Sequence, residues 1–379
     1  MRTDQLMLWL AESGAGFKTL DALFVGFCDH LQREGAGLSR AALGIEFLHP
    51  EISGQMLVWT DHAPVQHSET VRDGLAENPA YFLSPTRVVD ETGVPFRRRL
   101  DGPVPDMPLL EELRCAGMTD YYMVPLPFLD RTRTAVLSFA TRRPGGFTSA
   151  DLDRLQTLAA GASPWIERFV WQRLTADLLE TYVGARSGAR IISGTIERGS
   201  VETITAAIWF ADLRGFTALT ESRPVAEVIE ALGRWFELTV TAISGHDGEV
   251  LKFIGDAVLA IFPATPARSI ERACADAIQA ASDLGSAVDR MDAGRRFDFA
   301  LGLHAGDVAF GNVGAPRRLD FTVVGPAVNR AARLQDLAKK LGRRVVLSEA
   351  LALRVEAPLI PLGAHTLRGI AGAEPVYGL

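Results

Sequence analysis

The chain has 379 residues, 47% of them hydrophobic, and a formal net charge of −7, which predicts two domains with ample core material and argues against nucleic-acid binding. Three scattered cysteines, Cys28, Cys115 and Cys274, indicate neither a disulfide framework nor a zinc site. Because no apolar run approaches the roughly 20 residues that span a bilayer, and no basic-then-apolar leader begins the chain, we expect a cytoplasmic protein that does not bind membranes.

Residues 1–160 mix helical patterns with strand-like runs. The helical patterns lie near 19–32 and 109–116, and the strand-like runs are 42–47, 55–59, 121–127 and 135–140. This order, with the segments Val124-Pro-Leu-Pro and Gly146-Phe-Thr-Ser-Ala-Asp-Leu, resembles a GAF-type sensor domain. The resemblance implies an α/β module that binds a small ligand or mediates dimerisation. Four dispersed histidines, His30, His49, His62 and His67, are haem or metal candidates but fit ordinary surface or core positions better.

Residues 161–200 are expected to be a helical linker and connector. Ser163 as N-cap and Pro164 at the first helical position predict where the linker helix begins. Its apolar residues recur every four positions, from Ile166 to Leu178, and this stripe either pairs across a dimer axis or packs on its own domain. Glycines in 181–200 predict a flexible connector into the next domain.

Two aspartates stand at the ends of strand-like runs. Asp212 follows the apolar run 203–210, and Asp256 ends the segment Lys252-Phe-Ile-Gly-Asp256. Two carboxylates at neighbouring strand ends can hold divalent cations against a nucleoside triphosphate, since hard oxygen ligands suit Mg²⁺. The alternatives are that Asp212 only caps a helix and that Asp256 only occupies a hairpin turn.

A candidate phosphate-binding turn follows directly, formed by Leu213, Arg214, Gly215, Phe216 and Thr217. Gly215 allows close approach of the backbone, and the N–H groups at a following helix start can donate to phosphate oxygens.

A second group of polar residues lies further along the chain. The strand 320–324 carries Thr322, and after a Gly-Pro turn a helix carries Asn329 and Arg333. The i, i+4 spacing places both side chains on one helical face, where they can reach one ligand or merely face solvent. An arginine in such a place can stabilise charge that develops on a phosphoryl oxygen.

The C-terminal elements are predicted in the order strand, helix, two strands, helix, strand. They are 203–210, 225–244, the hairpin 250–262, 270–291 and 297–313, with the further strand 320–324. This is the ferredoxin-like α+β order.

With these motifs in this order, residues 201–379 resemble the catalytic domain of class III adenylyl and guanylyl cyclases. The resemblance implies that Asp212 and Asp256 bind two Mg²⁺ or Mn²⁺ ions and that Lys252 and Thr322 read the purine. It further implies that Asn329 orients the ribose and Arg333 stabilises the transition state. Arg368, in Thr366-Leu-Arg-Gly-Ile370, is a candidate triphosphate contact or an exposed loop arginine.

Adenine is the expected base, because a lysine can donate to its N1 and a hydroxyl can accept from its amino group. Lys252 and Thr322 fit ATP, and the threonine resembles the Thr-type subset of bicarbonate-responsive cyclases. The family also implies a homodimer whose sites combine Asp212 and Asp256 of one chain with Lys252, Thr322, Asn329 and Arg333 of the other. The alternatives are a guanylyl or dual-specificity cyclase, or a non-catalytic nucleotide-binding regulator.

Overall fold

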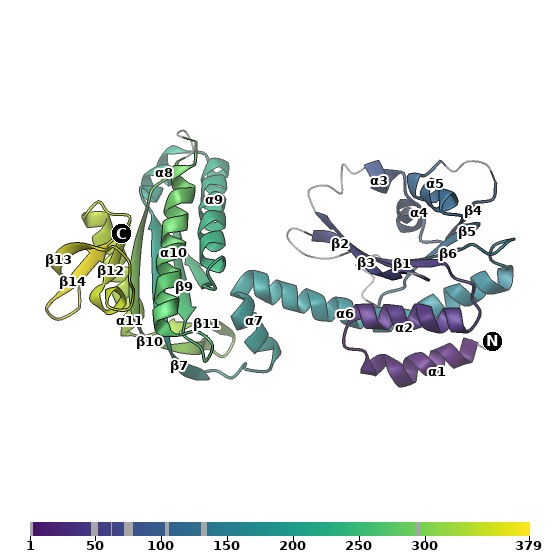
Figure 1. Cartoon of the computed structure of the whole chain (residues 1–379), viewed down its shortest axis with the longest axis horizontal. Coiled ribbons are helices and arrows are strands. Elements are labelled where there is room, and N and C mark those ends of the chain that lie inside the picture. Colours follow the sequence, from purple (N-terminus) through teal and green to yellow (C-terminus); the bar gives the residue numbers. More distant parts are fainter. Residues whose placement is uncertain are drawn as a thin grey trace. The chain divides into compact units, whose positions relative to one another are not determined.

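The computed structural model describes residues 3–46, 52–61, 63–71, 79–102, 106–129, 135–292 and 296–379. The chain forms two compact units, Met1–Leu178 and Leu179–Leu379 (Figure 1), and each unit is described on its own. Each unit is built of helices and a mainly antiparallel sheet, so the predicted mixture of helix and strand is confirmed.

The N-terminal unit is built on a six-stranded antiparallel sheet with the order β3-β2-β1-β6-β5-β4. The strands are β1 (Arg40–Glu46), β2 (Ile52–Thr60), β3 (Ala63–Val71), β4 (Phe96–Arg99), β5 (Asp120–Pro125) and β6 (Ala135–Thr141). Four of the six, β1, β2, β5 and β6, coincide with the predicted runs. Neither β3 nor the short β4 was anticipated, because their charged and polar residues hide the strand pattern.

Helices cover both faces of this sheet. They are α1 (Thr3–Ser13), η1 (Gly14–Gly16), α2 (Leu20–Arg33), α3 (Pro79–Phe82), α4 (Pro85–Thr92), α5 (Pro108–Cys115) and the first part of α6 (Ser149–Val183). Figure 1 shows α1, α2 and α6 on one face and α3, α4 and α5 on the other. Strand β5 serves both cores, since Tyr122 and Val124 pack toward α2 and α6 while Tyr121 and Met123 pack toward α4 and α5.

The linker helix begins earlier than predicted. The expected start at Ser163 and Pro164 is wrong, because α6 runs without interruption from Ser149 to Val183 with the proline inside it. The start is marked by a reciprocal cap: Thr148 Oγ1 accepts from the Asp151 amide at 3.2 Å, and Asp151 Oδ2 accepts from the Thr148 amide at 2.8 Å. The proline costs one helical hydrogen bond, but the core contacts of this helix hold it.

The apolar stripe of α6 packs on the N-terminal unit. Leu155, Leu158, Ile166 and Val170 belong to its main core, whereas Leu178 at the end of the unit is 38% exposed. Of the two interpretations of the stripe, packing on its own domain therefore holds for the residues up to Val170.

The connector 181–200 is not uniformly irregular, so its description as a flexible segment is corrected. It contains α7 (Ala185–Ile192), whose Ser187 and Gly188 are buried. Glu249 accepts hydrogen bonds from the amide and hydroxyl of Ser187 at 3.1 and 3.2 Å. Gly184 begins this helix with a φ of 89°, a conformation that favours glycine. The connector is therefore anchored to the C-terminal unit.

The C-terminal unit has eight strands, with β13-β14-β12-β10-β7-β9-β8 in one path and β11 paired to β10. The strands are β7 (Val201–Leu213), β8 (Glu249–Ile254), β9 (Ala257–Pro263), β10 (Phe299–Ala315), β11 (Arg318–Val324), β12 (Val345–Ser348), β13 (Ile360–Thr366) and β14 (Ala373–Gly378). The helices are α8 (Phe216–Ser222), α9 (Val225–Ser244), α10 (Ile270–Asp289), α11 (Pro326–Lys340) and α12 (Glu349–Ala352).

The first six large elements, β7, α9, β8, β9, α10 and β10, form the predicted ferredoxin-like arrangement. Strand β7 is buried on both faces. Ala207, Trp209 and Ala211 pack against α9 and α10, whereas Ala206 and Ile208 pack against β11 and the start of α11. Figure 1 shows α9 and α10 covering one face of this sheet. This packing fixes the end of β7, where the candidate site lies.

Candidate active site

Asp212 is the penultimate residue of β7, and its side chain is only 18% exposed. Its Oδ2 contacts the ammonium of Lys339 and accepts a hydrogen bond from Gln335 Nε2 at 3.4 Å. Its Oδ1 is buried and has no hydrogen-bond partner. Asp212 Oδ1 can therefore accept a further ligand.

Asp256 lies in the two-residue hairpin loop, Gly255 and Asp256, that joins β8 to β9. Gly255 has a φ of 64°, which a residue with a Cβ adopts reluctantly. The indole of Trp235 donates to the Asp256 carbonyl at 2.8 Å and fixes the loop on α9. The pairing of Ala211 with Val258 places the start of β9 beside the end of β7. Asp256 is thus a hairpin residue, and the hairpin brings it to Asp212.

The two carboxylates influence each other. Burial, followed by the neighbouring carboxylate of Asp212, raises the pKa of Asp256 to about 7. Like-charged groups this close favour either a shared proton or a bound cation. The residues therefore fit a divalent metal: both offer hard oxygen ligands, and Asp212 Oδ1 is unsatisfied. No group of three metal-ligating side chains occurs in the described parts of the chain, so further ligands would be backbone, water or substrate oxygens.

The turn after Asp212 is held by Arg214. Its guanidinium donates to the carbonyl oxygens of Phe299 at 3.1 Å, Ala338 at 3.1 Å and Arg343 at 2.6 Å. Gly215 has a φ of 73°, and α8 begins at the next residue. The side chain of Arg214 therefore ties the turn to β10 and to the end of α11 instead of projecting toward a ligand.

The other residues of the turn contribute mainly their backbone. Leu213 is buried in the core, and Phe216 packs against the same core. Thr217 has no hydrogen bond from its hydroxyl among the described contacts, and its side chain is exposed. The Arg214 amide donates to the Asp298 carbonyl at 2.8 Å, so the turn offers the amides of Gly215, Phe216 and Thr217 and the hydroxyl of Thr217 as candidate donors to phosphate.

Lys252, on β8, contacts the carboxylate of Asp320 on β11. Thr322 lies two residues beyond Asp320, is buried, and pairs across the ladder with Gly311. The structure therefore brings Lys252 to the strand that carries Thr322. Sequence reasoning missed Asp320, although the two-residue period of a strand places it on the same face as Thr322.

Helix α11 presents polar residues in two directions. Asn329 is exposed and makes no side-chain hydrogen bond among the described residues, and Arg333 Nη1 donates to Asp336 Oδ2 at 3.2 Å. Gln335, which faces Asp212, is two residues beyond Arg333, or about 200° around the helix at about 100° per residue. Arg333 consequently points away from the aspartate pair of its own chain.

Arg368 lies in the turn after β13 and is exposed, with no ion pair among the described contacts. Its neighbour Leu367 is buried and anchors the turn. The structure thus leaves Arg368 free, but no described contact joins it to the other candidate residues.

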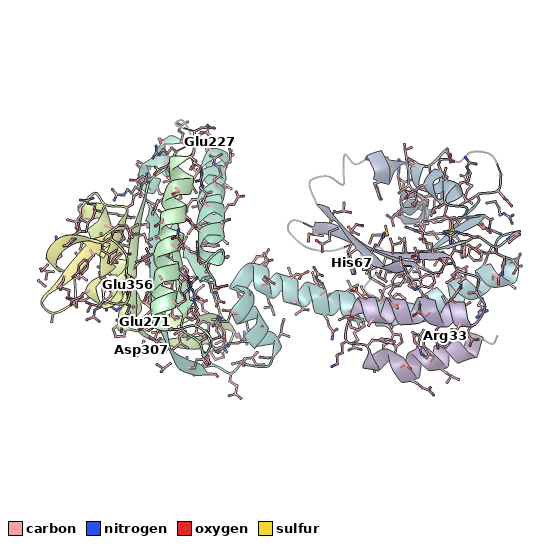
Figure 2. The ribbon with its side chains drawn as sticks, in the orientation of Figure 1. Arg33, His67, Glu227, Glu271, Asp307 and Glu356 are labelled. Carbon is pink, nitrogen blue, oxygen red and sulfur yellow. The ribbon has the colours of Figure 1, made fainter. Side chains whose placement is uncertain are left out.

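In the described part of the chain, no dispersed histidine belongs to a group of three or more potential metal-ligating side chains. His67, labelled in Figure 2, lies on β3 with its Nε2 3.3 Å from Asp21 Oδ2. His30 stacks on Trp9. The candidates His49 and His62 lie outside the described residues.

Residues 199–367 match the family model described as the adenylate and guanylate cyclase catalytic domain. The C-terminal unit contains a class III cyclase catalytic domain. The paired aspartates at the ends of β7 and of the β8–β9 hairpin lie within the matched segment, as do Lys252, Thr322, Asn329 and Arg333.

Similar proteins come from several bacteria. The chain is 34% identical over 206 residues to an uncharacterized protein of Mycobacterium tuberculosis, and the aligned segment covers 54% of this chain and 37% of that protein. It is 32% identical over 174 residues to adenylate cyclase 1 of Rhizobium meliloti, covering 44% and 26% respectively. The chain thus spans little more than a third of the length of the first of these curated relatives and about a quarter of the second.

A solved structure of a bacterial light-regulated adenylyl cyclase is 24% identical, with 68% of this chain and 85% of that chain covered and a TM-score of 0.50. This likeness concerns the fold. No helix in the described ranges is long and apolar enough to cross a membrane.

Proposed function

We propose that the protein is an adenylyl cyclase that converts ATP to 3′,5′-cyclic AMP and pyrophosphate. The observation that carries the proposal is the meeting of Asp212 and Asp256 at adjoining strand ends of a cyclase catalytic domain, with one buried carboxylate oxygen unsatisfied. Such a pair has a clear use in binding metal and triphosphate together, and little value for stability, because like charges repel.

Asp212 and Asp256 would hold two Mg²⁺ or Mn²⁺ ions. When bound, these ions neutralise the triphosphate and lower the pKa of the ribose 3′-hydroxyl. The turn from Leu213 to Thr217 follows Asp212 directly, and the amides of Gly215, Phe216 and Thr217 at the start of α8 would donate to phosphate oxygens. Arg214 supports this turn through three carbonyl groups. Arg368 is a further candidate for the phosphates because it is exposed and free of ion pairs among the described contacts.

In the reaction, the 3′-hydroxyl oxygen attacks the α-phosphorus in line, a new P–O bond forms, the bond to pyrophosphate breaks, and the hydroxyl proton passes to water or to Asp212. Asn329 would orient the ribose by hydrogen bonding. The guanidinium of Arg333 would stabilise the charge that develops on the phosphoryl oxygens. Both groups lie on one face of α11. Before they contact the nucleotide, the one described contact that would have to break is the exposed ion pair of Arg333 with Asp336.

For the base, Lys252 would donate to adenine N1 and Thr322 would accept from the 6-amino group. The contact with Asp320 supports this role, since it holds the ammonium of Lys252 beside β11. A threonine is a less demanding acceptor than a carboxylate, so GTP remains the competing substrate, and the Thr-type, bicarbonate-responsive subset is part of the proposal. Turnover of ATP and GTP by one preparation decides between them.

We further propose that the active form is a homodimer with composite sites. The support is geometric: Gln335 directs one face of α11 to Asp212, whereas Arg333 on the opposite face points away from it. Arg333 and Asp212 of one chain therefore lie on different sides of α11, and a site that presents both groups to one triphosphate would combine two chains related by a two-fold axis. A regulator that only binds nucleotide would need neither the arginine nor the second metal ligand.

The N-terminal unit is proposed to be a GAF-like sensor that regulates the cyclase. A six-stranded antiparallel sheet with helices on both faces supports this proposal. So does a cavity of about 410 Å³ between β1, β2, β6 and the helices α3 to α5, a size suited to a small ligand. Helix α6 and the anchored α7 join this unit to β8, which carries Lys252. Deletion of residues 1–178 should therefore alter the basal turnover of the remaining C-terminal unit.

The proposal is tested by incubating the purified chain with Mn-ATP or Mn-GTP and separating the products by anion-exchange chromatography. We expect cyclic AMP and pyrophosphate in equal amounts, with Asp212→Asn at least about 100-fold slower. Binding of ATP without any cyclic product, in dimeric protein, would instead identify a non-catalytic nucleotide-binding regulator.

A further inference from the structure

Helix α11 places two polar side chains on the metal-binding aspartate of its own chain. Gln335 is 3% exposed and donates to Asp212 Oδ2, and the ammonium of Lys339, one turn further, contacts the same oxygen. Neither residue belongs to the set that the sequence motifs single out. They form a polar clamp on Asp212, defined here as Gln335 and Lys339.

The clamp depends on an unusually close approach of helix and sheet. A Cβ built on Gly302 of β10 would lie 2.0 Å from the carbonyl oxygen of Ala331 and 2.4 Å from the amide nitrogen of Gln335. Gly302 pairs with Phe210, two residues before Asp212. Glycine at this position therefore lets α11 lie directly on the sheet, where side chains from its C-terminal half reach the end of β7.

Lys339 carries a positive charge, and the carboxylates of Asp212 and Asp256 attract such a charge as they would attract a metal ion. The Lys339 side chain is 39% exposed, and Asp212 is its described ion-pair partner. An ammonium is a compact point charge that satisfies a carboxylate without fixed geometry. A divalent ion at Asp212 would either take the oxygen that Lys339 contacts or bind Oδ1 while facing a positive charge, and both cases weaken metal binding.

We infer that Lys339 is the resident counter-cation of Asp212 and the group that a divalent metal displaces, so that Lys339 sets the metal affinity of the site. The inference rests on the proposed function only in using Asp212 as a metal ligand. Gln335 is a positioning residue that keeps the carboxylate in place while the cations exchange. After displacement, the flexible stem of Lys339 can carry its charge to the solvent side of the site.

The experiment titrates Mn²⁺ into the full-length protein without nucleotide and measures free Mn²⁺ by electron paramagnetic resonance. We expect Lys339→Met to lower the dissociation constant about tenfold, which corresponds to about 1.4 kcal/mol. Lys339→Gln serves as a second uncharged variant in case the first does not fold. Lys339→Arg, which keeps the charge, and Lys340→Met, the exposed neighbour, should both match the wild type.

An unchanged or weaker Mn²⁺ affinity in the two uncharged variants would overturn the inference, and so would equal tightening by Lys339→Arg. Asp212→Asn should abolish the effect, and Mn²⁺ binding that ignores Asp212 would remove the basis of both this inference and the proposed function. If the titration behaves as expected but no cyclic nucleotide forms, the proposed function fails alone.

Discussion

The proposed composite site makes a quantitative prediction for mixtures of inactive chains. Asp212→Ala removes a proposed metal ligand, and Arg333→Ala removes the guanidinium on the face of α11 that points away from Asp212. Each change alone is expected to lower turnover by about 100-fold or more, since each removes charge stabilisation from the transition state. If two chains share each site, one dimer of both variants has one intact site and one site that lacks both groups.

The size of the recovery follows from pairing statistics. In an equal mixture with free exchange, about half of the dimers are mixed, and each has one of two sites intact, so about a quarter of wild-type activity should return. Cyclic AMP formation is measured after co-expression with two different tags. The matched control mixes Asp212→Ala with Asp256→Ala: both lesions lie in the same half-site, so no recovery is expected. Activity of the first mixture no higher than its components would refute the shared site, as would full activity of a monomer.

Three further predictions concern other groups. Lys252→Glu should lower ATP turnover about 100-fold. The introduced carboxylate would face the carboxylate of Asp320, so the added change Asp320→Asn should further raise the ratio of GTP turnover to ATP turnover. Parallel assays with both nucleotides measure this ratio. Burial lowers the pKa of His304 from 6.5 to about 4. Between these two values the unfolded chain binds a proton that the folded chain does not, so the free energy of unfolding falls by up to about 3 kcal/mol as the pH drops from 6.5 toward 4. Urea unfolding across this range should show the loss, and His304→Gln should flatten it. Glu249→Gln weakens two hydrogen bonds to Ser187, so hydrogen exchange in α7 should accelerate about tenfold, whereas unchanged protection would contradict an anchored connector.

The amino-acid sequence predicted the order of the elements from β7 to α11, apart from the short α8, but it predicted neither the exact ends of most of them nor β12, α12, β13 and β14. Helix α9, for example, spans the predicted residues 225–244, and the hairpin that carries Asp256 was read from two apolar runs around a Gly-Asp turn. Such features are local: the period of apolar residues and the chemistry of a turn lie within a few positions. The family motifs depend on the same local spacing, and so they too could be recognised without coordinates.

Tertiary structure alone decided which distant groups meet. Lys252 contacts Asp320 across 68 positions of sequence, and Lys339 reaches Asp212 across 127. No local pattern encodes such pairs, because they depend on how β11 and α11 pack over the second face of the sheet. The same holds for Arg214, a phosphate candidate by sequence whose guanidinium is taken by three backbone carbonyls. It holds as well for α6, which continues through Pro164 because core burial outweighs one lost hydrogen bond.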